Sequence, residues 1–198
     1  MEAVRAAKNV LRQELKRRLK CLSADEKVKQ SHFITQKLLA HPVYQKSQRI
    51  SVYLAMKDQE VDTDGILLDI FAQNKLCFIP QYIGPKMNML KLLSMDDYDS
   101  LPKTKWNIKQ PAENDVREDA LQTGGLDLII LPGLGFSKDG HRLGRGKGYY
   151  DIYQKRCVDE TGVKPATIAL AFKEQMCESI PTNENDVPVD VVLYGDMD

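Results

Sequence analysis

The sequence lacks a charge excess, a metal-binding cysteine pair and an apolar run of membrane length. Lys plus Arg and Asp plus Glu both number 28, so nothing in the overall charge favours nucleic acid or an anionic membrane. The four cysteines form no C-x-x-C pair, which favours reduced thiols over a disulfide framework. No apolar run approaches the roughly 20 residues of a membrane helix. We therefore expect a cytoplasmic protein that binds neither nucleic acid nor membrane.

Histidine is also scarce, which limits the chemistry that the chain can perform. The three histidines, His32, His41 and His141, belong to no H-E-x-x-H pattern and to no Ser-His-Asp order. Zinc hydrolysis and triad catalysis therefore have little support. Phosphoryl transfer fits better, because it depends mainly on positioning and on neutralising charge.

What the chain does have is the composition of a globular α/β protein. Its 198 residues are 42% hydrophobic and 28% charged, which is enough for a sizeable core, and no linker or repeat divides them. Buried-strand patterns alternate with helical ones, so we expect a single domain over residues 1–198 with an open, mainly parallel sheet. The expected strands cover residues 50–54, 76–79, 128–131, 166–172 and 191–193, with a weaker edge strand over 87–93.

Four helices are expected, two before the first strand and two between strands. An amphipathic helix occupies residues 4–22, and a second begins at the capping box of Ser23 and ends at His41-Pro42. A third starts at Asp62 or Thr63, and the fourth covers residues 148–159. Pro80 is expected to stop the second strand. In such sheets ligands bind at the carboxyl ends of the strands, which gathers residues 54–60, 80–82, 133–151 and 172 at one rim, with 183–190 as a further candidate.

The most distinctive segment, Gly140–Asp151, reads GHRLGRGKGYYD. Glycines let backbone N–H groups approach an anion, and Arg145 and Lys147 between them supply positive charge. Tyrosine rings and a carboxylate follow, so a polyphosphate, a ring and Mg²⁺ are the expected ligands. The segment is no P-loop, because His141 and Gly148 stand where that motif needs Gly and Ser or Thr. A solvated basic loop is the plain alternative.

Two further features leave alternatives open. The first helix presents Arg5, Lys8, Arg12 and Lys16 on one side, either as a solvated face or as a face that reaches an anion. Asp151 is a candidate Mg²⁺ ligand, with Asp186 or Asp190 as the second, although each Asp could equally cap a helix or form a turn. Trp106, the only Trp, is either a core residue or a ligand platform.

The Gly140–Asp151 segment, preceded by Leu131-Pro-Gly-Leu-Gly-Phe136, resembles the signature of the 5-formyltetrahydrofolate cyclo-ligase family, specifically its vertebrate type. The similarity extends over nearly the whole chain. The other matching segments are Lys8-x-x-x-Arg12, Leu54-x-Met56, residues 101–107, Gly124–Asp127, Ala169–Cys177 and Asn183–Asp186.

This resemblance implies a three-layer α/β/α sandwich and an enzyme that uses ATP and Mg²⁺. The implied reaction converts 5-formyltetrahydrofolate, with or without a polyglutamate tail, to 5,10-methenyltetrahydrofolate, through attack of the formyl oxygen on the γ-phosphate. ADP and phosphate are released. We also expect a monomer.

The resemblance also implies roles for individual residues, by matched position. Arg145, Lys147 and Tyr149 are expected to be catalytic, and Asp151 and Asp186 to bind Mg²⁺. The expected ATP-binding residues are Lys8, Asn9, Val10, Leu11, Arg12, Arg142, Leu143, Gly144, Arg145, Gly146, Lys147, Gly148, Tyr149 and Tyr150. The expected folate-binding residues are Leu54, Glu60, Tyr82, Trp106, Arg145, Gly146, Lys147, Gly148 and Tyr149.

The segment Lys57-Asp-Gln-Glu60 is one residue longer than the family pattern, which leaves Gln59 and Glu60 as alternatives for the pterin contact. We favour Glu60, because this choice keeps the Glu-x-acidic-Thr run intact through Thr63, and its carboxylate can accept hydrogen bonds from the pterin's donor nitrogens. Two other functions stay open on the residues alone. One is an ATP-independent sugar-phosphate isomerase or transferase, and the other is an RNA-binding module that uses the basic helix and the glycine-rich loop.

Overall fold

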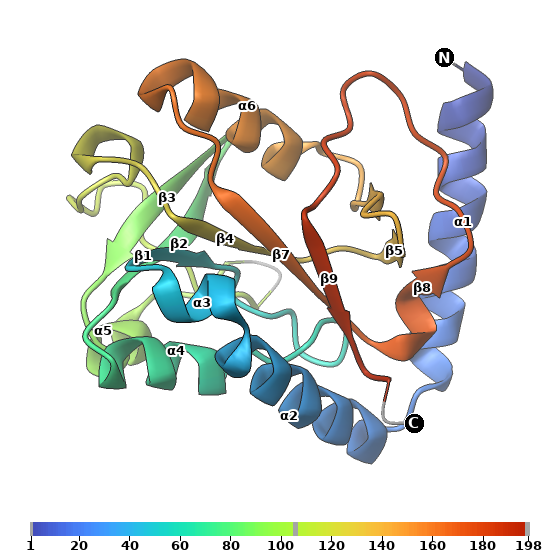
Figure 1. The fold of residues 1–198 in the computed structure, drawn as a ribbon, viewed down its shortest axis with the longest axis horizontal. Coiled ribbons are helices and arrows are strands. Elements are labelled where there is room, and N and C mark those ends of the chain that lie inside the picture. The colour runs from blue at the N-terminus through green and yellow to red at the C-terminus, as the bar shows by residue number, and fades with distance from the viewer. Residues whose placement is uncertain (1, 105–106, 197–198) are drawn as a thin grey trace.

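Six strands form a central sheet in the order β3-β2-β1-β4-β7-β9 (Figure 1). The computed structural model describes residues 2–104 and 107–196. Neighbouring strands pair in parallel except β2 and β3, which form an antiparallel pair at one edge. The strands are β1 (Arg49–Val52), β2 (Leu76–Ile83), β3 (Lys86–Leu92), β4 (Leu128–Leu131), β7 (Ala166–Ala171) and β9 (Val191–Tyr194).

Helices cover both faces of this sheet. The chain leaves the β1–β4 centre in opposite directions, through α4 to β2 and through α6 to β7, and right-handed crossovers place these helices on opposite faces. Figure 1 shows α2, α3 and α4 on one side, α6 on the other, and α1 at one end of the molecule. This confirms the expected three-layer α/β/α fold. The helices are α1 (Glu2–Cys21), α2 (Ala24–Ala40), α3 (Pro42–Lys46), α4 (Asp64–Ala72), α5 (Met95–Ser100) and α6 (Tyr149–Thr161).

The core lies on both faces of the central strands. All four residues of β4 are fully buried, as expected for an apolar strand covered from both sides. Helix α4 supplies Ile66, Leu67 and Ile70 to the core, and α6 supplies Tyr153 and Cys157. The sheet is thereby held rigidly, and the loops at its carboxyl edge are positioned by it.

A second, three-stranded sheet lies beside α1 and was not predicted. Its strands, in the order β6-β5-β8, are β5 (Gly135–Ser137), β6 (Arg142–Leu143) and β8 (Met176–Cys177). The helix packs closely here, because a Cβ on Gly135 would lie 2.5 Å from Leu15 Cδ1. Leu15, Leu143 and Ile180 form a small buried cluster at this contact.

The predicted strand boundaries need one correction. Strand β2 does not stop at Pro80 but continues to Ile83, paired with β3. The ladder between β1 and β2 ends at Phe78, so the missing N–H of Pro80 leaves no bond of that ladder unmade. The weak alternation over 87–93 is confirmed as edge strand β3.

The predicted helix starts are largely confirmed. Ser23 caps α2, and its hydroxyl accepts a backbone N–H from the first turn at 3.2 Å. Before α4, Thr63 holds the cap position, but its hydroxyl donates to the Tyr53 carbonyl at 3.0 Å. Asp62 Oδ1 instead accepts the Asp64 N–H at 3.0 Å, so both candidate residues order the start of this helix.

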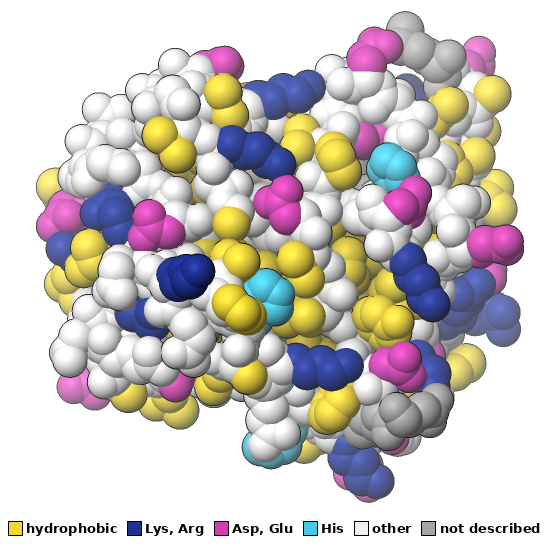
Figure 2. Space-filling model, viewed as in Figure 1, with side chains coloured by type: hydrophobic (Ala, Val, Ile, Leu, Met, Phe, Trp, Pro, Cys, Tyr) yellow, Lys and Arg dark blue, Asp and Glu magenta, His cyan; other side chains and the backbone are white. Residues whose placement is uncertain are grey.

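The surface agrees with the balanced composition. Figure 2 shows basic and acidic side chains interspersed on one face, without a large patch of one sign. In the described part of the chain, no helix is both long enough and apolar enough to cross a membrane.

Candidate active site

A cavity of about 290 Å³ opens where β1, β2 and β4 end. Residues at or just beyond the ends of these strands supply its wall. This confirms three of the five segments expected at the rim, 54–60, 80–82 and 133–151, whereas Phe172 and residues 183–190 do not line the cavity. It brings together residues far apart in sequence, as a small-molecule site requires. The expected site residues that line it are Leu54, Glu60, Tyr82, Arg142, Gly144, Arg145, Lys147, Gly148, Tyr149, Tyr150 and Asp151.

The other expected site residues that the structure describes do not line this cavity. Val10 on α1 is 71% exposed, whereas Leu11 and Leu143 pack in the apolar cluster beneath that helix. Gly146 is exposed and faces the Arg12 guanidinium. Trp106 lies outside the described residues. The expected roles of these residues stay predictions.

The wall contains an ion pair between Glu60 and Arg145. Glu60 Oε1 accepts Arg145 Nη2 at 3.1 Å and Nε at 3.3 Å, and Glu60 Oε2 accepts the Met56 N–H at 2.9 Å. Burial raises the pKa of Glu60, although the charge of Arg145 opposes this shift. Gln59 also accepts from Arg145, at 3.2 Å, but it is exposed and does not line the cavity.

Tyrosines form the aromatic part of the wall. The rings of Tyr82 and Tyr149 lie 4.9 Å apart at 55°, and the Tyr149 hydroxyl donates to the Gly84 carbonyl at 2.7 Å. Burial raises the pKa of Tyr82 to about 12. Tyr150 is also buried, and its hydroxyl has no hydrogen-bond partner among the described residues. These rings offer flat apolar faces to a ligand.

The glycine-rich loop leads from β6 into α6. Gly146 and Gly148 have φ of +111° and +68°, values that favour glycine, so the alternation of Gly with Arg145 and Lys147 is needed by the backbone. Lys147 is exposed and forms no hydrogen bond or ion pair with another described residue. A cation in the cavity wall is therefore available to a ligand.

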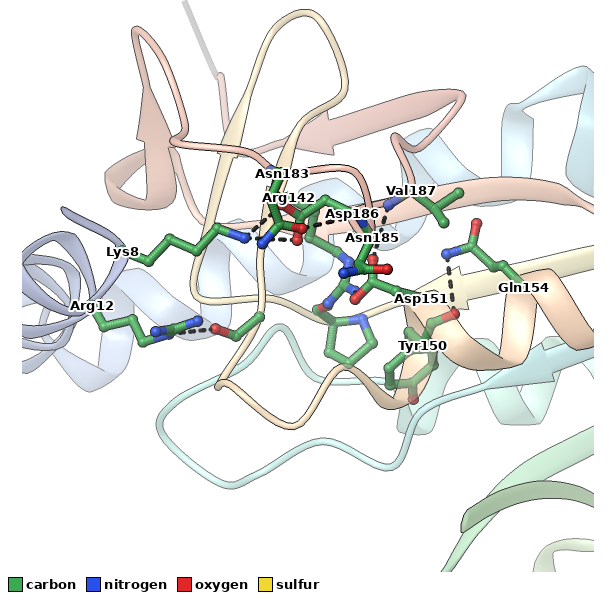
Figure 3. A network of polar contacts seen from close by, with 12 residues as sticks. Lys8, Arg12, Arg142, Tyr150, Asp151, Gln154, Asn183, Asn185, Asp186 and Val187 are labelled. Carbon is green, nitrogen blue, oxygen red and sulfur yellow. Dashed lines mark hydrogen bonds and ion pairs between the residues drawn. The ribbon is translucent and has the colours of Figure 1, made fainter. Parts of the chain in front are cut away.

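A polar network joins this loop to α1 and to the loop before β9 (Figure 3). Arg142 Nη2 pairs with Asp151 Oδ2 at 2.8 Å, and Asp151 Oδ1 accepts the Val187 N–H at 3.1 Å. Lys8 Nζ pairs with Asp186 at 2.5 Å. Figure 3 shows the two carboxylates entering the network from different elements, α6 and the loop.

The basic face of α1 is thus only partly solvated. Lys8 is only 8% exposed and pairs with Asp186. Arg12 Nε donates to the Gly144 carbonyl at 2.9 Å. Arg12 also donates to Asn9 Oδ1 at 2.7 Å. Arg5 and Lys16 are exposed. Half of the expected basic face therefore contacts loop residues, Asp186 and Gly144, and the other half meets solvent.

Of the two candidates for a second metal ligand, only Asp186 lies near Asp151. Asp190 pairs with Lys164 and accepts from the Thr167 backbone and hydroxyl, each within 2.9 Å. Thr167 lies at the amino end of β7, whereas the cavity lies at the carboxyl ends of the strands, so Asp190 is excluded from the site. Asp190 instead joins β7 to the loop that precedes β9.

The remaining carboxylates fit Mg²⁺ only together with a ligand. In the described ranges, no group of three or more His, Cys, Asp and Glu is arranged to hold a metal ion. Mg²⁺ typically uses one or two carboxylates, substrate phosphates and water. Asp151 and Asp186 match that number of carboxylates. Both oxygens of each already accept hydrogen bonds, Asp151 from Arg142 and Val187 and Asp186 from Lys8 and Asn183, so Mg²⁺ would use their remaining lone pairs or displace one of these partners.

The segment 104–110 contributes wall residues that were not predicted. Thr104, Ile108, Lys109 and Gln110 line the cavity, whereas only Trp106 had been singled out in this stretch. The local sequence reads as irregular loop. Contacts that hold it involve β2, some 28 residues away, so no periodicity or motif within the loop could have indicated them.

Comparisons with known proteins show which family and fold this chain shares. A model of the 5-formyltetrahydrofolate cyclo-ligase family matches residues 4–195. The chain is 60% identical to the 5-formyltetrahydrofolate cyclo-ligase of Mus musculus, covering 98% of this chain and 96% of that one. It is 36% identical to a probable 5-formyltetrahydrofolate cyclo-ligase of Caenorhabditis elegans, covering 98% and 95%. Its fold is similar to the NMR structure of Aquifex aeolicus 5,10-methenyltetrahydrofolate synthetase, with a TM-score of 0.74, 28% identity and coverage of 96% and 90%.

Proposed function

Because the chain belongs to the 5-formyltetrahydrofolate cyclo-ligase family, we propose that its cavity holds 5-formyltetrahydrofolate beside the terminal phosphate of ATP. The protein is an enzyme of this family and forms 5,10-methenyltetrahydrofolate. Membership favours this function over the sugar-phosphate enzyme and the RNA-binding module. The proposal extends to dependence on ATP and Mg²⁺, and to a cytoplasmic monomer that is one domain over residues 1–198.

The folate half of the site is assigned to the wall around Glu60. Its two carboxylate oxygens can accept hydrogen bonds from the donor nitrogens of the pterin. Leu54 and Tyr82 offer apolar and aromatic faces to the ring, and Trp106 is proposed to complete this pocket. Gln59 is the weaker candidate because it lies outside the wall.

The ATP half is assigned to the glycine-rich loop, the start of α6 and the basic side of α1. Arg142 supports this assignment, since its buried Nε has no partner in the part of the chain that the structure describes. Such a donor costs about 1–3 kcal/mol when unsatisfied, and a phosphate oxygen would satisfy it. Lys8 and Arg12 reach the same region from α1. Asn9, Val10, Leu11, Leu143, Gly146 and Tyr150 complete the proposed ATP set.

The reaction we propose has two steps. The formyl oxygen attacks the γ-phosphorus, the bond to the β,γ-bridging oxygen breaks, and ADP leaves. N10 then attacks the activated carbon and loses its proton, and phosphate departs with the former formyl oxygen. The protein's contribution is to align the two substrates and to stabilise charge.

Three wall residues are proposed to act on the reacting atoms. Arg145 and Lys147 face the region where phosphoryl charge develops, and Tyr149 orders the folate through its ring and its hydroxyl. Asp151 and Asp186 would hold Mg²⁺, which neutralises charge on the phosphates when bound. Arg142 and Lys8, the present partners of these carboxylates, are placed to bind phosphate oxygens as well.

The contact between Glu60 and Arg145 carries this proposal. It joins the proposed folate-binding carboxylate to the proposed phosphoryl-binding cation within one wall, at 3.1 Å. A pterin that donates to Glu60 competes with Arg145 for Oε1. Folate binding would then release Arg145 toward the phosphate, which favours ATP cleavage only when both substrates are present.

Oxygen labelling tests the reaction. The enzyme is supplied with 5-formyltetrahydrofolate carrying ¹⁸O in the formyl group, and the released phosphate is analysed by mass spectrometry. We expect one ¹⁸O in each phosphate. Methenyl product with unlabelled phosphate would contradict the phosphorylated intermediate, and absence of methenyl product would contradict the function itself.

A further inference from the structure

Strand β2 extends beyond the strand beside it. Its ladder with β1 ends at Phe78, whereas the strand continues to Ile83. The edge that β1 leaves uncovered is occupied by the loop that follows α5. Gln81 holds this loop, because its Nε2 donates to the Ala112 carbonyl at 2.7 Å and to the Pro111 carbonyl at 3.4 Å.

Gln110 holds the strand from the loop side. Its Oε1 accepts the Tyr82 N–H at 3.2 Å, and its Nε2 donates to the Tyr82 carbonyl at 3.2 Å. One side-chain amide thereby makes both bonds that a residue of a neighbouring strand would make. The backbone N–H of Gln110 donates to the Pro102 carbonyl at 3.0 Å, so the amide extends from a closed loop.

This clamp acts at the aromatic wall of the cavity. Tyr82 carries the ring that lies 4.9 Å from Tyr149, and two residues later Gly84 accepts the Tyr149 hydroxyl. Gln110 itself lines the cavity next to them. The backbone of Tyr82 fixes the direction of its ring, and Gln110 fixes that backbone.

We propose that Gln110 is a positioning residue for folate, which it orders through the backbone of Tyr82 rather than through the chemistry. This inference rests on the proposed function, in which Tyr82 faces the pterin. It separates Gln110 from the ATP half of the site, which none of its side-chain hydrogen bonds reaches. Loss of the clamp should therefore weaken folate binding and leave ATP binding unchanged.

The folate KM of the variant Gln110→Glu, measured at two pH values, tests this inference. An ionised carboxylate accepts the Tyr82 N–H but repels its carbonyl, whereas a protonated carboxyl group both donates and accepts, as the amide does. The variant should raise the KM for 5-formyltetrahydrofolate about tenfold at pH about 8, the loss expected from one or two hydrogen bonds. The increase should shrink as the pH falls toward about 6, because the facing carbonyl and partial burial raise the carboxyl pKa. The KM for ATP should change less than about twofold at either pH.

Three comparisons make the result specific. The KM of each variant is divided by the KM of the wild type at the same pH. The effects of wall charges that both proteins share, including Glu60, Arg142 and Arg145, then cancel. Lys109, the adjacent charge, is paired with Asp99 at 2.8 Å in both. Gln110→Ala should raise the folate KM at every pH, and Gln122→Glu, the same change at an exposed glutamine, should have no effect.

Amide hydrogen exchange provides a readout that does not need turnover. The Tyr82 N–H should exchange at least about tenfold faster in Gln110→Ala than in the wild type, because its acceptor is gone. Unchanged exchange, or folate KM values within twofold of wild type in both Gln110 variants, would overturn the inference. Equal increases in both KM values with a lower unfolding temperature would also overturn it, as a merely structural role. A wild type that forms no methenyl product would refute the proposed function alone, since the exchange measurement still tests the clamp.

Discussion

Arg145 differs from the other cations of the site in its partners. It is bound by Glu60 and Gln59, both from the loop after β1, whereas Arg142 is bound by Asp151. Once folate binding frees it from Glu60, the Arg145 guanidinium can supply positive charge to the phosphoryl group. The location of Arg145 between the two proposed substrate halves makes it the residue whose loss should affect turnover most.

Arg145→Ala is therefore expected to lower kcat about 10²-fold or more, as seen for other groups that stabilise transition-state charge. The fold should remain intact, because the Arg145 side chain contacts only loop residues. Steady-state kinetics with circular dichroism checks both expectations. Arg17→Ala, at an exposed position of α1, is the matched control. Turnover within twofold of wild type would exclude the assigned role.

Glu60→Gln should make the protein more stable at neutral pH. The folded-state pKa of Glu60 is raised above its ordinary value of 4.5, so the ionised group is less favourable in the folded protein than in the unfolded chain. This unfavourable contribution is complete above the folded-state pKa and is absent below about pH 4.5. Thermal unfolding of both proteins across this range measures the difference. A variant that is less stable at pH 7, or a difference independent of pH, would contradict the sign.

Some site residues could be predicted from sequence and others could not. The glycine-rich segment identifies its own members, because positive φ and anion binding both require that local pattern. The sequence favoured Glu60 over its neighbour Gln59 for the pterin contact, and of the two only Glu60 lines the cavity. The role of Gln110 depends on a strand 28 residues away, and no local signal reports such a contact.

At the scale of elements, α1 is held by few contacts. Only Lys8, Leu15 and Leu19 are buried along its 20 residues, and the charged contact of Lys8 is with the loop before β9. Leu15 and Leu19 pack α1 against the core, whereas the Lys8 ammonium reaches the site, so loss of that cation should affect ligand binding more than overall stability. Removing one of its cations tests this directly.

Lys8→Met is expected to raise the KM for ATP about tenfold, the effect of losing one charge-assisted bond to phosphate. Lys16→Met removes the same charge from an exposed position of α1 and should change it less than about twofold. ATP titration of both variants at fixed folate concentration checks the pair. Equal effects would mean that the helix acts through its overall charge.

Gly140 fixes the relation between the glycine-rich loop and the loop before β9. It has a φ of +88°, and an added Cβ would lie 2.3 Å from the Val189 carbonyl oxygen. Gly140→Ala should cost about 1–3 kcal/mol of unfolding free energy, because neither strain nor clash can be relieved by a side-chain rotation.

Gly65→Ala is the control for this change. Its Cβ would meet Thr35 at 3.7 Å in a helical segment, so the variant should be as stable as wild type or about 0.5–1 kcal/mol more stable. Urea denaturation compares the two variants. A Gly140→Ala protein with unchanged stability would show that the two loops are not rigidly joined.

The elements that sequence predicted are those with long apolar runs or clear caps. Strand β4 and helix α2 begin where the patterns place them. The small β6-β5-β8 sheet escaped prediction because its strands have only two or three residues, too few for periodicity. The prediction that Pro80 ends β2 was wrong. Proline disrupts a strand only where a neighbouring strand needs its N–H, and the ladder between β1 and β2 ends before Pro80.

At the scale of the whole molecule, the order of strands accounts for the position of the site. The chain leaves β1 and β4 in opposite directions, and the loops after these two adjacent strands separate at the carboxyl edge. Glu60 follows β1, and the glycine-rich loop follows β4. Alternation of apolar strands and helices was sufficient to predict this edge, since it depends on topology more than on side-chain detail.

The same topology brings the two proposed substrates together at one edge. The loop after β1 offers the carboxylate for the folate, and the segment after β4 offers the cations and glycines for ATP. Neither half has both sets of groups. We therefore expect ring closure to require both substrates in one cavity.

The most direct test is the absorbance of the methenyl product. The wild-type protein is mixed with 5-formyltetrahydrofolate and Mg²⁺, with and without ATP, and ADP is measured in parallel. The product band should grow only when ATP is present, with one ADP formed per ring closed. Growth of the band without ATP, or ADP formation at the same rate without folate, would contradict this expectation.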